Sequence, residues 1–509
     1  MSIELTKTDI GTAEVLYDNF AEQGIDCDIS LPDYCPDIMR ILRCSVTNSI
    51  TNSKISGDRA TVDGNAKIRI VYADDKNGIY CYEQDYPFSK FSELPQTYDG
   101  AVLCSSAKTE YANCRAVSKK RIDIHGVVSI RFKIVGIKNE SVITDAEGDG
   151  IQLRKKKIGM DSVAAVVMKK FQLSQTEEAD GGEIGKIFYA CASPALSETK
   201  IIKGKILLKG EAVLKVMYCS ATGENESVCV NYNLPFSEII DIESIDDSCK
   251  VSVGFNVDQV QAEPKTDNDG EYKYLNLGCD ICAVVTAYRT EDICVITDSY
   301  STQKEIDAKY KTETFTQILQ NLNDSIICRE SVDLSSMNPQ RIYAAIAQSP
   351  EAKSRFDADK MTVTGKIPLK FILIDGEGTP TFCEREAEFE YSRSIDAKGG
   401  NLHCDPKLFL TGYSCTLTSD GRAEFKAEIN ISADITETSE CRTLVSLKTM
   451  ENSELKKRHS SLVICFCNGG EKIWDIARKY NTTVEDIMSE NELTSDEIGE
   501  KMMLMIPVK

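Results

Sequence analysis

The chain has 509 residues, of which 42% are hydrophobic and 27% are charged, and its formal net charge at pH 7 is −21. This length exceeds what one hydrophobic core supports, so the composition predicts roughly three or four domains of an ordinary globular protein. The strong negative charge repels phosphate backbones and therefore disfavours nucleic acid as a partner.

The N-terminal residues have neither the basic region nor the apolar region of a signal peptide. No apolar run approaches the ~18 residues that cross a bilayer. The 20 cysteines are scattered singly, apart from one CxxC at Cys279 and Cys282 and one CxC at Cys465 and Cys467. We therefore expect a cytoplasmic protein with reduced cysteines, no transmembrane segment and no structural metal site.

The first predicted element in chain order is a short amphipathic helix over residues 36–42, where Pro36 takes an early helical position. After Gly64, apolar residues alternate with polar ones, which predicts an antiparallel strand with one buried face. A motif Tyr-Pro-Phe-Ser-Lys at residues 86–90 follows a polar loop, and a second alternating stretch at residues 122–134 closes this part of the chain.

The same pattern occurs twice more along the chain. Gly210 and Gly365 begin similar alternating runs, and the three glycines are separated by about 150 residues, which is the size of a domain. The counterparts of the motif at 86–90 are Leu-Pro-Phe-Ser-Glu at residues 234–238 and Phe-Glu-Tyr-Ser-Arg at residues 389–393. Residues 339–346 are expected to form the third copy of the short helix.

Stretches rich in Ser, Thr, Glu and Lys predict linkers at residues 147–182, 298–324 and 436–460, with a helix-like pattern at residues 163–171 inside the first. The fold class that follows is a multidomain protein: three β-rich, mainly antiparallel repeat domains and a small α+β domain. The expected domain ranges are 1–150, 180–300 and 325–437 for the repeats and 461–509 for the C-terminal domain.

The last segment predicts the order β-α-α-β. Its first strand is an alternating run in which either Val463 and Cys465 or Ile464 and Phe466 face the core. Gly470 supplies the turn that ends this strand.

Two helices and a strand are predicted after that turn. The first helix begins at Ile473, because apolar residues recur on one face over residues 473–480. Thr483 is expected to cap the second helix, since Asp486 stands three residues later as in a capping box. The closing strand ends at Pro507.

Common catalytic motifs are missing from the sequence. It has no P-loop and no Gly-x-Ser-x-Gly. His125 lies within a strand pattern, opposite in phase to its apolar neighbours, and is interpreted as an exposed strand residue. We therefore expect no enzyme activity, no catalytic residue and no cofactor.

The pattern Gly-x-x-Ile-Trp-x-Ile-Ala-x-x-Tyr at residues 470–480, followed by Asn491 and by Leu-x-Ile-Pro at residues 504–507, resembles the LysM domain. This small module is best known for binding N-acetylglucosamine-containing glycans. The resemblance implies a groove for a ligand or a partner between two loops. Its residues in this chain are Gly470, Glu471, Lys472, Ile473, Trp474, Asn491, Leu493 and Ile498.

Both loops depart from the family's usual sequences. Residues 470–472 are Gly-Glu-Lys where the family usually has Gly-Asp-Thr, and residues 501–502 are Lys-Met where it usually has Gly-Gln. The resemblance therefore supports the fold more strongly than it supports glycan binding. For Trp474, packing between helix and strand is favoured over contact with a ligand.

Residues 31–38, Leu-Pro-Asp-Tyr-Cys-Pro-Asp-Ile, and the alternating run that leads to Pro-Phe-Ser resemble the SPOCS domain of spore coat proteins. Tandem SPOCS domains followed by one LysM domain resemble the SipL type of spore morphogenetic protein. This resemblance implies a scaffold in the mother-cell cytoplasm that assembles the coat at the forespore surface, with a coat basement-layer protein of the SpoIVA type as partner. The alternative is a peptidoglycan-binding protein anchored to cortex or cell wall.

Overall fold

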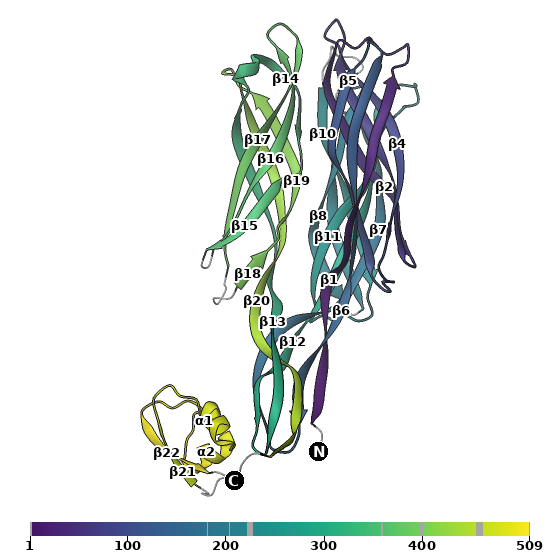
Figure 1. Ribbon diagram of the computed structural model, residues 1–509. Helices are drawn as coiled ribbons and strands as arrows, with labels where there is room; N and C mark the ends of the chain where they lie inside the picture. The colour runs from purple at the N-terminus through teal and green to yellow at the C-terminus, as the bar shows by residue number, and fades with distance from the viewer. Residues whose placement is uncertain are drawn as a thin grey trace.

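The computed structural model describes residues 3–180, 182–202, 204–220, 227–357, 360–395, 401–454 and 462–507. Figure 1 shows three elongated β-sandwiches standing side by side, with long strands that converge toward one end. A small C-terminal domain with two helices lies beside that end. Within these residues, no helix has the length and apolar character needed to cross a membrane.

Each sandwich is one repeat with the same strand order. The strands of the first repeat are β1 (Glu4–Ser30), β2 (Arg40–Ser56), β3 (Arg59–Ala73), β4 (Ile79–Glu93), β5 (Val102–Ala116) and β6 (Arg121–Glu147). They form two antiparallel sheets, with orders β1-β6-β5 and β2-β3-β4. The alternating apolar side chains of both sheets share one buried core, as period-two patterns predict.

The second and third repeats follow this plan. The second contains β7 (Ile151–Glu178), β8 (Ile184–Ile202), β9 (Lys205–Ser220), β10 (Ser227–Asp241), β11 (Lys250–Lys265) and β12 (Tyr274–Ser301). The third contains β13 (Lys304–Asp333), the 3-10 turn η1 (Ser335–Met337), β14 (Pro339–Ala347), β15 (Glu351–Asp357), β16 (Lys360–Asp375), β17 (Pro380–Ser394), β18 (Asn401–Cys404), β19 (Lys407–Leu417) and β20 (Arg422–Glu454). In the third repeat, two strands of the common plan are each divided into two shorter ones. β14 and β15 together pair with β16, and β18 and β19 together pair with β20.

The glycine found in every repeat makes room for an aromatic ring on the neighbouring strand. The pairs are Gly64 with Phe88, Gly210 with Phe236, and Gly365 with Phe389. A Cβ atom at Gly210 would lie 2.2 Å from the carbonyl oxygen of Ala195 and 2.6 Å from Cζ of Phe236. The predicted alignment of the third motif matched Tyr391 to Phe88 and was wrong by two residues, because Phe389 is the residue that pairs with the repeated glycine.

Each repeat has a β-bulge at the same position, and the side chains of the bulged residues pack against one another where the three sandwiches meet. The bulged residues are Leu42, Phe188 and Tyr343. Bulges re-aim side chains, and these three lie in one buried cluster shared by all repeats. The same cluster contains the equivalent residues Val71, Met217 and Ile372 of the central strands β3, β9 and β16.

The converging strands form a second junction between the repeats. The outer pairs, each made of the first and the last strand of a repeat, are β1 with β6, β7 with β12, and β13 with β20. One buried cluster takes side chains from all six strands, including Val142, Val295 and Phe315. We call this end of the molecule the stalk.

The two short helices predicted from the sequence are wrong. Residues 339–347 form β14, and the segment before β2 is a loop. The backbone N–H of Ile38 donates to Lys119, and that of Met39 donates to Ala73. The turn between β5 and β6 and the end of β3 thus supply the hydrogen bonds that a seven-residue helix, marginal in water, would have to make within itself.

Within the described residues, the stretches predicted as linkers are mostly strands, and residues 455–460 of the third stretch lie outside the described part of the chain. Residues 151–178 form β7, and the helix-like run from Val163 to Phe171 pairs with β12 from Tyr288 to Ile281. β13 and β20 likewise occupy residues 304–333 and 422–454. Most of their polar residues lie on the solvent side, although Asp161, Ser162 and Thr443 are buried. These strands are far longer than the usual 3–10 residues, which is why composition alone indicated linkers.

We predict that Gly210→Ala lowers the free energy of unfolding by about 1–3 kcal/mol, because the added methyl overlaps a backbone oxygen and a ring. Thermal or urea unfolding of the full chain measures the change. Gly159→Ala is the matched control, since its Cβ would meet its nearest neighbour, Asp292, at an ordinary 3.5 Å. Equal stability of the two variants would contradict this account of the repeated glycine.

Candidate functional site

The C-terminal domain has the predicted order β-α-α-β. Its elements are β21 (Leu462–Cys467), α1 (Ile473–Tyr480), α2 (Val484–Glu490) and β22 (Met502–Pro507), and the two strands pair antiparallel. The predicted cap of the second helix is confirmed, because the backbone N–H of Asp486 donates to Oγ1 of Thr483 over 3.0 Å. Both helices contribute to one buried core with the inner face of the strands.

The two loops of the predicted groove lie against each other. The N–H of Gly470 donates to the carbonyl oxygen of Ile498 over 2.7 Å, and the N–H of Ile498 donates to that of Glu471 over 2.9 Å. Gly470 has a φ of 87°, which favours glycine. The structure therefore brings these loop residues together, and much of their backbone hydrogen-bonding capacity is already used.

The predicted groove residues fall into two groups. Ile473 and Ile498 are buried, and half-buried Leu493 packs on the same core. The side chains of Glu471 and Lys472 are exposed.

Asn491 has a bridging role between α2 and β22. Its amide nitrogen donates to the carbonyl oxygens of Ile487 and Met505, over 2.8 and 2.7 Å. Its amide oxygen accepts from the N–H of Met505 over 2.7 Å. These three bonds hold the last strand against the second helix.

Trp474, the single tryptophan of the chain, lies at a junction with the second repeat. Its indole N–H donates to Oδ2 of Asp298 over 2.9 Å, and Arg478 donates to both oxygens of the same carboxylate. The ring of Tyr300 meets the indole edge-on, with 4.9 Å between centroids, and its hydroxyl donates to the carbonyl oxygen of Thr482. The domain is thus docked on β12 near the end of the stalk.

The sequence offered no signal for this junction. Asp298 and Tyr300 precede Trp474 by more than 170 residues and lie at the start of a stretch predicted as a linker. Only the long strand β12, which carries both side chains to the stalk end, places them beside the C-terminal domain.

The outer face of the β21–β22 sheet is apolar and open to solvent. Val463 and Cys465 face the core, which decides between the two predicted orientations of this strand. Ile464 is 57% exposed, Phe466 is 74% exposed, and they pair across the sheet with exposed Met505 and Met503. Leu462 extends the same face. We call these five residues the apolar sheet face.

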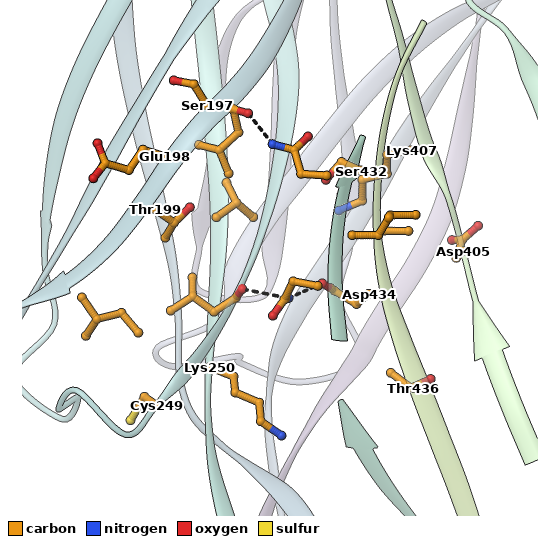
Figure 2. Close-up of a pocket in the computed structure, with 18 of the residues that line it drawn as sticks. Ser197, Glu198, Thr199, Cys249, Lys250, Asp405, Lys407, Ser432, Asp434 and Thr436 are labelled. Atoms are coloured by element: carbon orange, nitrogen blue, oxygen red, sulfur yellow. Dashed lines mark hydrogen bonds between the residues drawn. The ribbon is translucent and has the colours of Figure 1, made fainter. Parts of the chain in front are cut away.

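A cleft of about 700 Å³ lies between the second and third repeats (Figure 2). In this cleft the Nδ2 of Asn321 donates to Asp434 over 2.6 Å. Ser252, next to the lining residue Val251, also donates to this carboxylate. Asn323 donates to the carbonyl oxygen of Leu196 over 2.7 Å. These bonds join β8 and β11 to β13 and β20, so the polar groups of the cleft hold two repeats together.

We predict that Asp298→Ala releases the C-terminal domain from the stalk, because it removes three hydrogen bonds worth about 2 kcal/mol or more in total. Fluorescence reports the change directly, since Trp474 becomes exposed and its emission shifts to the red. Asp292→Ala on the same strand is the control, because Asp292 pairs with Lys157 at an exposed site. The docked arrangement is contradicted if both variants keep the emission of the unmodified chain.

Comparison with known families accounts for both parts of the chain. The family model described as SipL, SPOCS domain matches residues 37–117 and 183–265, and the LysM domain model matches residues 470–507. No curated protein and no solved structure matches the chain. Both domain types are non-catalytic binding domains and fit a sporulation coat protein. With tandem SPOCS domains followed by a C-terminal LysM domain, the chain matches the SipL type of spore coat protein.

Proposed function

We propose that the protein is a non-enzymatic adaptor of spore coat assembly, which docks through its LysM domain and its repeats to a coat basement-layer protein of the SpoIVA type. It acts in the mother-cell cytoplasm at the forespore surface. In this proposal the third sandwich, residues 304–454, serves as a further SPOCS-like domain, since it has the strand order of the other two.

The apolar sheet face is the observation that carries the proposal. An exposed cluster of Leu, Ile, Phe and Met side chains marks a surface that gains free energy when a protein covers it. Glycan hydroxyl groups placed there lose water without gaining hydrogen-bond partners. This face therefore suits a protein better than a polysaccharide.

The loops of the groove support the same choice. The backbone groups of Gly470, Glu471 and Ile498 bond to one another. Fewer of these groups remain for sugar hydroxyls, which must be hydrogen-bonded when they are buried. The departures from Gly-Asp-Thr and Gly-Gln lie in these same loops.

Docking of the LysM domain on the stalk gives the adaptor a defined geometry. Trp474 faces Asp298 of the second repeat, whereas Phe466 stays open to solvent in the full chain. A partner bound to the apolar sheet face is therefore held at a fixed place relative to the three repeats. A second weak contact from a repeat then adds to the first through effective concentration.

We predict that the double substitution of Ile464→Ser and Phe466→Ser weakens binding of the full chain to a purified SpoIVA-type protein by at least ~10-fold, because it removes the most exposed apolar side chains of the face. A pull-down with titrated partner measures the loss, and circular dichroism checks the fold. Lys472→Ala, in the groove loop, is the matched variant that keeps binding.

The opposite pattern, with binding lost only in Lys472→Ala, would place the contact in the loop groove. A parallel sedimentation with insoluble peptidoglycan tests the alternative function. If the unmodified chain sediments with peptidoglycan and ignores the purified protein, the adaptor proposal fails.

A further inference from the structure

One cation recurs at the same place in all three repeats. Arg69, Lys215 and Lys370 stand at equivalent positions of the central strands β3, β9 and β16. In the first repeat Nε of Arg69 contacts Glu83 on the neighbouring strand at 2.5 Å. In the third, Nζ of Lys370 contacts Glu384 at 3.0 Å. The repeat is thus built with a cross-strand ion pair at this position.

The second repeat keeps the cation and lacks the carboxylate. The residue that pairs with Lys215 across the strands is Asn231. Lys215 is only 5% exposed, and its ammonium donates to the carbonyl oxygen of Tyr413 over 3.1 Å and lies over the Tyr413 ring. Among the residues that the structure describes, no carboxylate forms an ion pair with it.

Other groups near the ammonium do not supply negative charge. Loss of hydration raises the pKa of the Cys191 and Cys229 thiols above the ordinary value, so both are neutral near pH 7. A second buried cation, Arg43 of the first repeat, lies with its guanidinium carbon 5.8 Å from the centroid of the Tyr189 ring. Its Nε has no hydrogen-bond partner within the described part of the chain.

A small pocket lies beside this unbalanced charge. Its volume is about 60 Å³, and its lining residues, which include Lys215, Asn231, Tyr189, Gln348 and Tyr413, come from the second and third repeats. A water molecule takes about 30 Å³, so the pocket has room for a small inorganic anion together with a water molecule. An amide such as Asn231 donates hydrogen bonds to an anion where a glutamate would repel it.

We propose that this pocket binds a small inorganic anion, such as chloride, which replaces the glutamate that pairs with the equivalent cation in the other two repeats. A buried ammonium without a counter-ion is costly, and an anion beside it removes much of that cost. Because the lining comes from both repeats, the bound anion also stabilises the junction between them.

The test is the midpoint of thermal unfolding of the full chain in sodium chloride and in sodium gluconate at equal ionic strength. Gluconate is too large for the pocket. The unmodified chain is expected to melt about 2 °C or more higher in chloride. Asn231→Glu restores the ion pair of the other repeats and is expected to melt at the same temperature in both salts. Lys215→Met is likewise expected to lose the chloride response.

Two results overturn the proposal. One is an unmodified chain that melts equally in both salts. The other is a chloride response that is the same in the unmodified chain, Asn231→Glu and Lys215→Met, because that response is a general salt effect. A crystal soaked in sodium bromide gives an independent readout: an anomalous scattering peak beside Nζ of Lys215 supports the site, and a pocket without one contradicts it.

Discussion

Three equivalent side chains, Val71, Met217 and Ile372, meet in one buried cluster, and this contact sets how the three repeats stand together. Burial of each such side chain contributes about 1.5–3 kcal/mol. Equivalent residues can meet only where the copies are arranged around a common axis. The chain is therefore organised like a three-subunit ring made within one polypeptide, although its copies are free to differ in sequence.

The bulges explain how a sandwich can supply this contact. Along a regular strand, successive side chains point alternately into the core of their own sandwich and toward solvent. Without a bulge, the side chains of Leu42 and Phe188 would follow this alternation. The bulge adds one residue and turns that side chain toward the neighbouring repeats. The long strands then carry the same arrangement down to the stalk, where the LysM domain docks on β12.

Local patterns were sufficient for the inner strands of each repeat, the repeat itself and the LysM fold. Each depends on short-range chemistry: period-two alternation, the glycine that admits a ring, and the cap at Thr483. Local patterns were not sufficient for the long strands β7, β13 and the end of β20, whose composition indicated linkers. The prediction of a short helix at residues 36–42 failed because the partners of Ile38 and Met39 lie in distant parts of the chain, the turn between β5 and β6 and the end of β3. The docking of Trp474 on Asp298 was unpredictable for the same reason, since nothing near either residue indicates the other.

The differences between the copies are as informative as the similarities. Residues shared by all three, such as the glycine and the cation of the central strand, build the sandwich. Asp145 of the first repeat and Asp298 of the second occupy equivalent positions, since each directly follows a β-bulge in the last strand of its repeat. Asp145 forms an ion pair with Lys155. Asp298 instead accepts hydrogen bonds from Trp474 and Arg478. One position thus has a structural role in one copy and a docking role in another. A repeat whose fold is secured by the shared residues can change the remaining ones, so departures from the repeat are where its binding sites are expected.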